Sequence, residues 1–266
     1  MATVNDIYAF LNDLAPVRYQ MDFDNAGFLV GDGSAAVEHV LLALDITNEV
    51  IAEAAALHAQ LIVSHHPLIF TPLRHATTDD LTGRKVLALA RNGIAAVCMH
   101  TNLDVAAGGV NDELAAALRL EDPGPFLEDG LGRIGHLAEP VPLADFAART
   151  AAALNCNGLR YADAGKPVYR VAVGGGACGE YADAAAAAGC DTFVTADLNY
   201  HAFLDAAGKG INLIDAGHFP TEDPVCRVLI AYLQEQFPAL SVEKSASHRE
   251  AIQYYVKGES DYVRTF

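Results

Sequence analysis

Short apolar runs that end in polar residues recur along the chain, and Ala-rich stretches lie between them. The runs are continuous and do not alternate with polar residues, which is typical of strands covered on both faces. The predicted strands are residues 40–44, 61–63, 94–99, 168–173, 192–195 and 211–214. The predicted helices are residues 49–58, 83–91, 109–118, 143–153, 181–188 and 225–237. This alternation predicts an α/β fold with helices packed on mainly parallel or mixed sheets.

Two other segments shape this prediction. Residues 121–135 are rich in Pro, Gly and Asp, and they mark the best internal boundary between two strand-helix series. Near the end of the chain, residues 251–256 predict one further strand at a sheet edge.

Several predicted strands are followed by residues of the types that bind metal ions. In open α/β sheets, ligands collect outside the carboxyl ends of the strands. The residues found there are His65 and His66, His100 and Asp104, His218 and Glu222, and Asp45 and Asp197. Imidazole and carboxylate together are a donor set suited to Zn²⁺, Fe²⁺ or Mn²⁺. A polar rim of loops without a metal is the alternative interpretation.

Spacing bears on whether these residues can converge. Adjacent histidines on a regular strand point to opposite faces, but Pro67 follows His66, and a bend there lets both rings turn toward one cavity. His218 and Glu222 are four positions apart and share a face if that segment is helical.

Two glycine-containing motifs remain open. The turn at Gly174–Gly176 follows a strand and suits either a phosphate cradle or a tight helix–strand turn. It matches neither a dinucleotide-binding fingerprint nor a P-loop. Residues 22–27 predict a turn that leads into a strand. Whether they also belong to a functional site is not decided by the sequence.

Composition narrows the function classes. With 52% hydrophobic and 19% charged residues, the chain is expected to be globular. A net charge of −17 argues against nucleic-acid binding and against docking on an anionic membrane, although a bound metal would still admit a small anionic substrate. The scattered cysteines are expected to be reduced, and neither a signal peptide nor a membrane span is recognised. A cytoplasmic location is therefore predicted.

Four segments together resemble a known family. They are residues 24–31 (DNAGFLVG), 64–70 (SHHPLIF), 100–104 (HTNLD) and 215–222 (DAGHFPTE). This combination resembles the signatures of the dinuclear-metal-centre hexameric proteins, whose members often carry the name GTP cyclohydrolase 1 type 2. The motifs occur in the family's order and span most of the chain.

The resemblance implies a fold, an assembly and a ligand set. Family members have two interlinked α/β halves and form a ring-shaped homohexamer with metal sites facing an internal cavity. Two divalent ions per subunit are implied, most readily zinc, iron or manganese. The implied ligands are His65, His66, Asp104, His218 and Glu222, with Asp104 as the bridging carboxylate. Convergence of these ligands predicts a discontinuous metal-binding domain, residues 1–124 plus 210–266, and a second domain, residues 125–209.

Two more segments carry a weaker likeness. Residues 195–201 (TADLNYH) resemble a family segment that usually has Gly at the position of Ala196, so Asp197 and His201 are expected to line the cavity. The C-terminal residues 260–266 (SDYVRTF) resemble the family's usual ending only loosely.

The first functional hypothesis is a metal-dependent hydrolase. Two cations would lower the pKa of a water molecule, and His100 or His201 would transfer its proton. The family name implies ring opening of GTP, although no motif in the sequence is known to bind guanine or triphosphate. The alternative is a non-enzymatic metal-binding hexamer that acts as scaffold, metal store or chaperone. A regulatory protein with a degenerate site is a third, weaker hypothesis.

Overall fold

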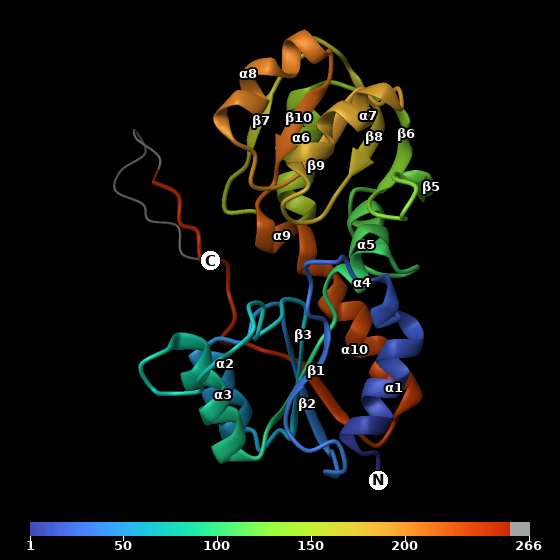
Figure 1. Cartoon of the computed structure of the whole chain (residues 1–266). Coiled ribbons are helices and arrows are strands. Elements are labelled where there is room, and N and C mark those ends of the chain that lie inside the picture. Colours follow the sequence, from blue (N-terminus) through green and yellow to red (C-terminus); the bar gives the residue numbers. More distant parts are fainter. Residues whose placement is uncertain (256–266) are drawn as a thin grey trace. The chain divides into compact units, whose positions relative to one another are not determined.

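The computed structural model describes residues 1–255 and divides the chain into two compact units. The first unit contains residues 1–107 and 226–248, and the second contains residues 108–225 together with the segment that begins at residue 249. Each unit has its own sheet with helices packed on it, so the predicted α/β fold is confirmed (Figure 1). No helix within residues 1–255 is both long and apolar enough to cross a membrane.

The first unit is built on a five-stranded sheet in the order β1-β4-β3-β2-β11. Its strands are β1 (Gly27–Val30), β2 (His39–Ala43), β3 (Leu61–Ser64), β4 (Ala95–Cys98) and β11 (Ser241–Lys244). Its helices are α1 (Val4–Leu14), η1 (Val17–Tyr19), α2 (Asn48–Ala56), α3 (Leu81–Asn92) and α4 (Thr101–Val105), with most of α10 (Pro224–Gln236). The four strands from β4 to β11 pair in parallel and β1 is antiparallel to β4. As a result, the carboxyl ends of β2, β3 and β4 lie at one edge.

Helices cover both faces of this sheet, with α2 and α3 on one face and α1 and α10 on the other (Figure 1). The fully apolar interiors of β2, β3 and β4 follow from this double cover. Local sequence sets the helix ends: the Thr47 side chain accepts a hydrogen bond from the Val50 N–H to cap α2, and Gly93 ends α3 at φ 64°.

The second unit has a six-stranded mixed sheet in the order β5-β6-β8-β9-β10-β7. Its strands are β5 (Glu121–Pro125), β6 (Arg133–Val141), β7 (Arg160–Ala162), β8 (Val168–Val173), β9 (Thr192–Thr195) and β10 (Asn212–Asp215). Its helices are α5 (Val110–Ala117), α6 (Leu143–Ala153), η2 (Gly179–Tyr181), α7 (Ala182–Ala187), α8 (Tyr200–Lys209) and α9 (His218–Glu222). The central strands β8, β9 and β10 are parallel, and α6 buries Leu143, Phe146 and Ala147 in the core beside them.

The unit boundaries differ from the predicted domain limits of 124/125 and 209/210. Strand β10 pairs with β9 and β7 in the second sheet, and so residues from 210 to 225 belong to the second unit. Helix α5 also belongs there, which moves the first boundary to residue 108. Backbone pairing therefore assigns the segment that carries α9 to the second unit, whereas the expected convergence of the metal ligands placed it in the first.

The Pro- and Gly-rich segment 121–135 contains a strand that the sequence did not predict, because Glu121–Pro125 forms edge strand β5, where Pro123 and Pro125 are tolerated. The strand predicted at residues 251–256 is wrong for residues 251–254, which form no strand. Val256, the end of that predicted strand, and the C-terminal segment 260–266 lie outside the described residues.

Candidate metal centre

The end of β3 brings two adjacent imidazoles together. The backbone of His65 and His66 continues to pair with β2, through N–H groups that donate to the carbonyls of Ala43 and Leu44. The ring centroids of His65 and His66 are nevertheless only 4.9 Å apart. The two rings therefore lie close together, as predicted, although the backbone keeps its pairing with β2 through His66.

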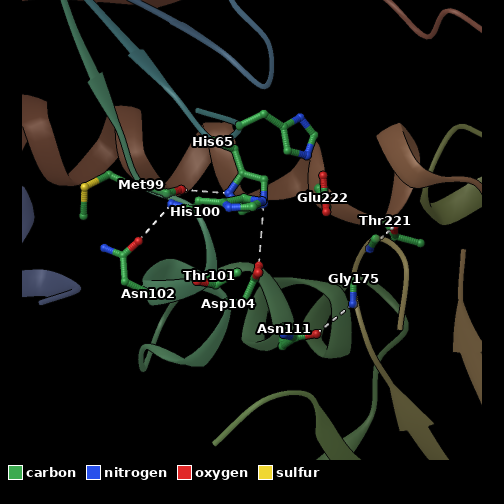
Figure 2. Close-up of polar contacts among 12 residues, drawn as sticks. His65, Met99, His100, Thr101, Asn102, Asp104, Asn111, Gly175, Thr221 and Glu222 are labelled. Atoms are coloured by element: carbon green, nitrogen blue, oxygen red, sulfur yellow. Dashed lines mark hydrogen bonds and ion pairs between the residues drawn. The ribbon is translucent and has the colours of Figure 1, made fainter. Parts of the chain in front are cut away.

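The next strand along the sheet adds His100 and Asp104. Strand β4 runs into α4, and His100 is the residue immediately before that helix. The His100 ring lies 5.2 Å from His65 and 5.6 Å from His66 between centroids. One turn later, Asp104 Oδ1 lies 3.6 Å from His65 Nε2 (Figure 2). One ligand atom from each of the three histidines lies within 4.8 Å of the others, a group that can hold a metal ion.

A hydrogen-bond acceptor lies behind each of these histidines. His65 Nδ1 donates to the Met99 carbonyl at 2.8 Å (Figure 2), and His66 Nδ1 donates to Asp45 Oδ1 at 2.9 Å. Carbonyl and carboxylate oxygens only accept, so the proton must lie on Nδ1. The lone pair is then on Nε2, which is the tautomer of a metal-ligating histidine.

His100 follows the same rule through Asp24. Its Nδ1 donates to Asp24 Oδ1 at 2.7 Å, and the Thr101 N–H donates to Asp24 Oδ2 at 3.0 Å. The Asp24 side chain is fully buried. Burial raises its pKa, but the hydrogen bonds from His100 and Thr101 outweigh burial and lower the pKa to about 2. Asp24 is therefore a carboxylate at neutral pH.

Asp45 is held as an anion for the same reason. Burial raises its pKa, while hydrogen bonds from His248 and His66 lower it well below the ordinary value of an aspartate. A permanently charged carboxylate behind His66 increases the basicity of that imidazole and fixes its orientation.

The second unit supplies a comparable histidine–carboxylate group on α9. His218 and Glu222 share one face of this short helix, as the spacing predicted, and His218 Nε2 lies 3.1 Å from Glu222 Oε1. Behind His218, its Nδ1 donates to Asp197 Oδ2 at 2.6 Å. Asp197 has φ 55°, a left-handed conformation that aspartate tolerates better than most residues.

Asp215 ties together the segments that carry Asp197 and His218. Its Oδ2 accepts a hydrogen bond from the Leu198 N–H at 3.0 Å, and its Oδ1 accepts one from the Gly217 N–H at 3.1 Å. Arg160 forms an ion pair with the same carboxylate. Asp215 therefore holds the ends of β9 and β10 at a fixed spacing.

The glycine turn after β8 packs against this group. The N–H of Gly175 donates to Asn111 Oδ1 (Figure 2), and the N–H of Gly176 donates to Thr221 Oγ1 at 3.0 Å. A Cβ on Gly176 would lie 2.3 Å from Glu222 Oε1. The N–H groups of Gly175 and Gly176 thus bind other residues of the protein, which favours a tight turn over a phosphate cradle. The absence of a side chain at Gly176 leaves room for the carboxylate of Glu222.

The donor chemistry of both units fits a cation. In each unit an imidazole Nε2 that carries a lone pair approaches a carboxylate oxygen, at 3.6 Å for His65–Asp104 and 3.1 Å for His218–Glu222. At 3.1 Å, two acceptors need a proton or a cation between them, whereas the 3.6 Å separation of the first pair is beyond hydrogen-bond distance and leaves room for a cation. His39 is different, because Leu57 and Glu243 accept from its two ring nitrogens and make it a structural residue.

The second residue predicted to be catalytic, His201, lies on α8. It is exposed, and its ring contacts that of Tyr200 at 5.5 Å between centroids. Its catalytic role stays a prediction.

Sequence reasoning left the role of Asp24 open and recognised Asp45 only as a residue at a strand end. Asp24 is 76 positions from His100, and no local spacing rule connects the two. The sequence signal for Asp24 is the DNAG turn at residues 24–27. Its polar side chains directly precede a strand, where buried polar groups require hydrogen-bond partners.

Residues 2–251 match the model of the Duf34/NIF3 (NGG1p interacting factor 3) family. Proteins named GTP cyclohydrolase 1 type 2 homolog are 37% identical to this chain in Clostridium perfringens, over 84% of this chain and 87% of that protein, and 37% identical in Streptomyces coelicolor, over 88% and 87%. A crystal structure of a Bacillus cereus protein related to NIF3 superposes with a TM-score of 0.90 at 26% identity, covering 96% of this chain and 99% of that one.

Proposed function

Because the chain belongs to the Duf34/NIF3 (NGG1p interacting factor 3) family, we propose that it is a metal-dependent hydrolase. The observation that carries the proposal is the pairing of an Nδ1-protonated histidine with a facing carboxylate in each unit, His65 with Asp104 and His218 with Glu222. In the proposal, both groups contribute to one dinuclear centre.

The ligands of this centre are the residues that the resemblance implies. They are His65, His66, Asp104, His218 and Glu222. Imidazole nitrogen with carboxylate oxygen is a donor set for zinc, iron or manganese, and it lacks the soft thiolates that select copper(I). Two divalent ions per chain would also neutralise the carboxylates, whose charge would otherwise oppose an anionic substrate.

When bound, such ions supply Lewis acidity, which makes water a nucleophile near neutral pH and stabilises negative charge as it develops. The protein's own contribution to proton transfer is assigned to His100. Its Nδ1 keeps its proton and donates it in the hydrogen bond to Asp24, so Nε2 can accept a proton from the attacking water and return it to the leaving nitrogen or oxygen. The Asp24 carboxylate would stabilise the imidazolium formed in between.

The substrate assigned here is a purine nucleotide such as GTP, with water adding at C8 of the guanine ring and opening the imidazole. The names of the relatives from Clostridium perfringens and Streptomyces coelicolor support this choice. A homohexameric ring is part of the same proposal. Light scattering on the purified protein tests the ring: six chains per particle are expected, and a monomer contradicts it.

Turnover of GTP by protein reconstituted with zinc, iron or manganese tests the function. We expect ring opening by the wild type and a loss of more than about 100-fold in His65→Ala. His58→Asn is the matched control, because it changes an exposed histidine of the same unit whose positive φ suits Asn. Equal activity of wild type and His65→Ala would contradict the proposal. Two bound ions without hydrolysis of GTP or related nucleotides would favour the metal-binding scaffold.

A further inference from the structure

Two large aromatic side chains of the first unit are exposed side by side. Phe23 is 65% exposed and Phe70 is 50% exposed, and their ring centroids are 6.3 Å apart at an interplanar angle of 57°. Exposed apolar residues are common singly, but two phenylalanines gathered at one spot indicate a surface that meets something apolar.

The exposure of Phe23 does not come from a loose loop. Asn25 Nδ2 donates to the Ile69 carbonyl at 2.6 Å, which ties the Phe23 loop to the segment that carries Phe70. On the other side, the Met21 N–H donates to Thr101 Oγ1 at 2.9 Å. The adjacent Asp24 is buried against His100. The protein therefore holds both residues in place while half or more of each stays exposed.

The pair is continuous with the histidine group. The Phe70 ring lies edge-on to His100, with centroids 6.2 Å apart and an angle of 86° between the planes. Phe70 also lines a hollow of about 600 Å³ with Leu68, Pro72 and Arg74, but Phe23 and His100 are not among the residues that line it. The contact between the Phe70 and His100 rings, and not this hollow, is what would place a ligand resting on Phe70 beside His100.

We propose that Phe23 and Phe70 form a platform that binds a planar aromatic heterocycle, such as a purine ring, beside His100. Flat rings gain from contact with aromatic faces, whatever hydrogen bonds their edges make. The inference rests on the proposed function for the role of the ring as substrate, and it adds how the substrate would be recognised: through its ring, independently of its phosphates.

The test uses the full chain and the fluorescent nucleoside 2-aminopurine riboside, whose emission is quenched when it stacks. The chain contains no Trp, which keeps the background low. We expect quenching by the wild type, with and without EDTA treatment, and on the order of tenfold weaker binding in Phe23→Ala and in Phe70→Ala. Phe23→Tyr and Phe70→Tyr keep a ring and should stay within about twofold of wild type. Leu81→Ala removes an apolar side chain that is 67% exposed and lies outside the platform, and it should have no effect.

Inorganic triphosphate, which has no ring, should compete with GTP for wild type and for both alanine variants equally. Absence of quenching with wild type at millimolar probe, or equal affinity in the alanine variants, would overturn the proposal. A smaller particle mass in the alanine variants with unchanged probe binding would also overturn it and assign the pair to contacts between copies. Failure of the proposed function would look different, because the protein would bind no metal while ring binding still depended on Phe23 and Phe70.

Discussion

Asp24 accepts a hydrogen bond from His100 Nδ1 at 2.7 Å across 76 positions of sequence, and its carboxylate is fully buried. The contact fixes the tautomer of His100 and its direction at the end of β4. Since Asp24 also accepts from the N–H of Thr101, one carboxylate joins the start of α4 to the loop that carries Phe23.

Stability should depend on pH through Asp24. Its pKa in the folded protein, about 2, lies below the ordinary 3.8, so its contribution is present above pH 4 and is lost as pH falls toward 2. For the metal-free protein we expect Asp24→Asn to lower the free energy of unfolding at pH 7 by up to about 2 kcal/mol. Urea unfolding at several pH values between 7 and 2.5 measures this difference, which should shrink in acid. A difference that stays constant with pH would contradict the account.

Asp45 should control metal affinity without being a ligand. It lies behind His66, and replacing it by Asn keeps the shape but removes the charge that raises imidazole basicity. We expect Asp45→Asn to weaken zinc or manganese binding about 10- to 100-fold, measured by competition with a chromogenic chelator. Glu243→Gln is the matched control, because it alters another histidine–carboxylate pair, with His39 at 2.6 Å. Equal effects of the two substitutions would argue against a specific role for Asp45.

Gly176 should be required for the position of Glu222. A Cβ at this residue would lie 2.3 Å from Glu222 Oε1 and 3.1 Å from His218 Nε2. We expect Gly176→Ala to reduce metal affinity by at least about tenfold, since both groups must move. Gly189→Ala separates this clash from backbone strain: Gly189 also has positive φ, 80°, but a Cβ there meets nothing within 4 Å. Chelator titration should therefore show normal metal binding in Gly189→Ala, and a parallel loss in both variants would refute the clash.

Asp215 should matter for stability as well as for the site. It pairs with Arg160 and accepts two backbone hydrogen bonds, and its side chain is 6% exposed. Replacing it by Ala leaves two backbone N–H groups without their acceptor, while the largely exposed Arg160 keeps the Leu198 carbonyl. We expect a loss of about 1–3 kcal/mol in unfolding free energy, measured by denaturant titration. Asp163→Ala, at an exposed turn of the same unit, should change stability by less than about 0.5 kcal/mol. A similar small change in Asp215→Ala would show that the carboxylate does not hold the strand ends.

Features with a local physical signal could be predicted from the sequence. Buried strands such as β2 and β3 are continuous apolar runs, and α6 begins and ends at the predicted residues, Leu143 and Ala153. The proximity of His65 and His66 was expected from their place at the end of a strand.

The parts that sequence missed depend on partners distant in the chain. Strand β5 has a composition typical of loops, and only its pairing with β6 makes it a strand. The predicted boundary near residue 210 differs from that of the compact units, because the apolar sequence of β10 does not show which sheet the strand joins. The roles of Asp24, Phe23 and Phe70 could not be predicted from the sequence, because they depend on contacts between segments that are distant in the chain.

We propose that one pair of metal ions is held by His65, His66 and Asp104 together with His218 and Glu222. X-ray diffraction from metal-loaded crystals, recorded at the absorption edge of the bound metal, is the decisive measurement. We predict two anomalous peaks per chain, with ligands from both sets of residues. Peaks contacted by one set alone, or no peak at these residues in fully loaded protein, would contradict the account.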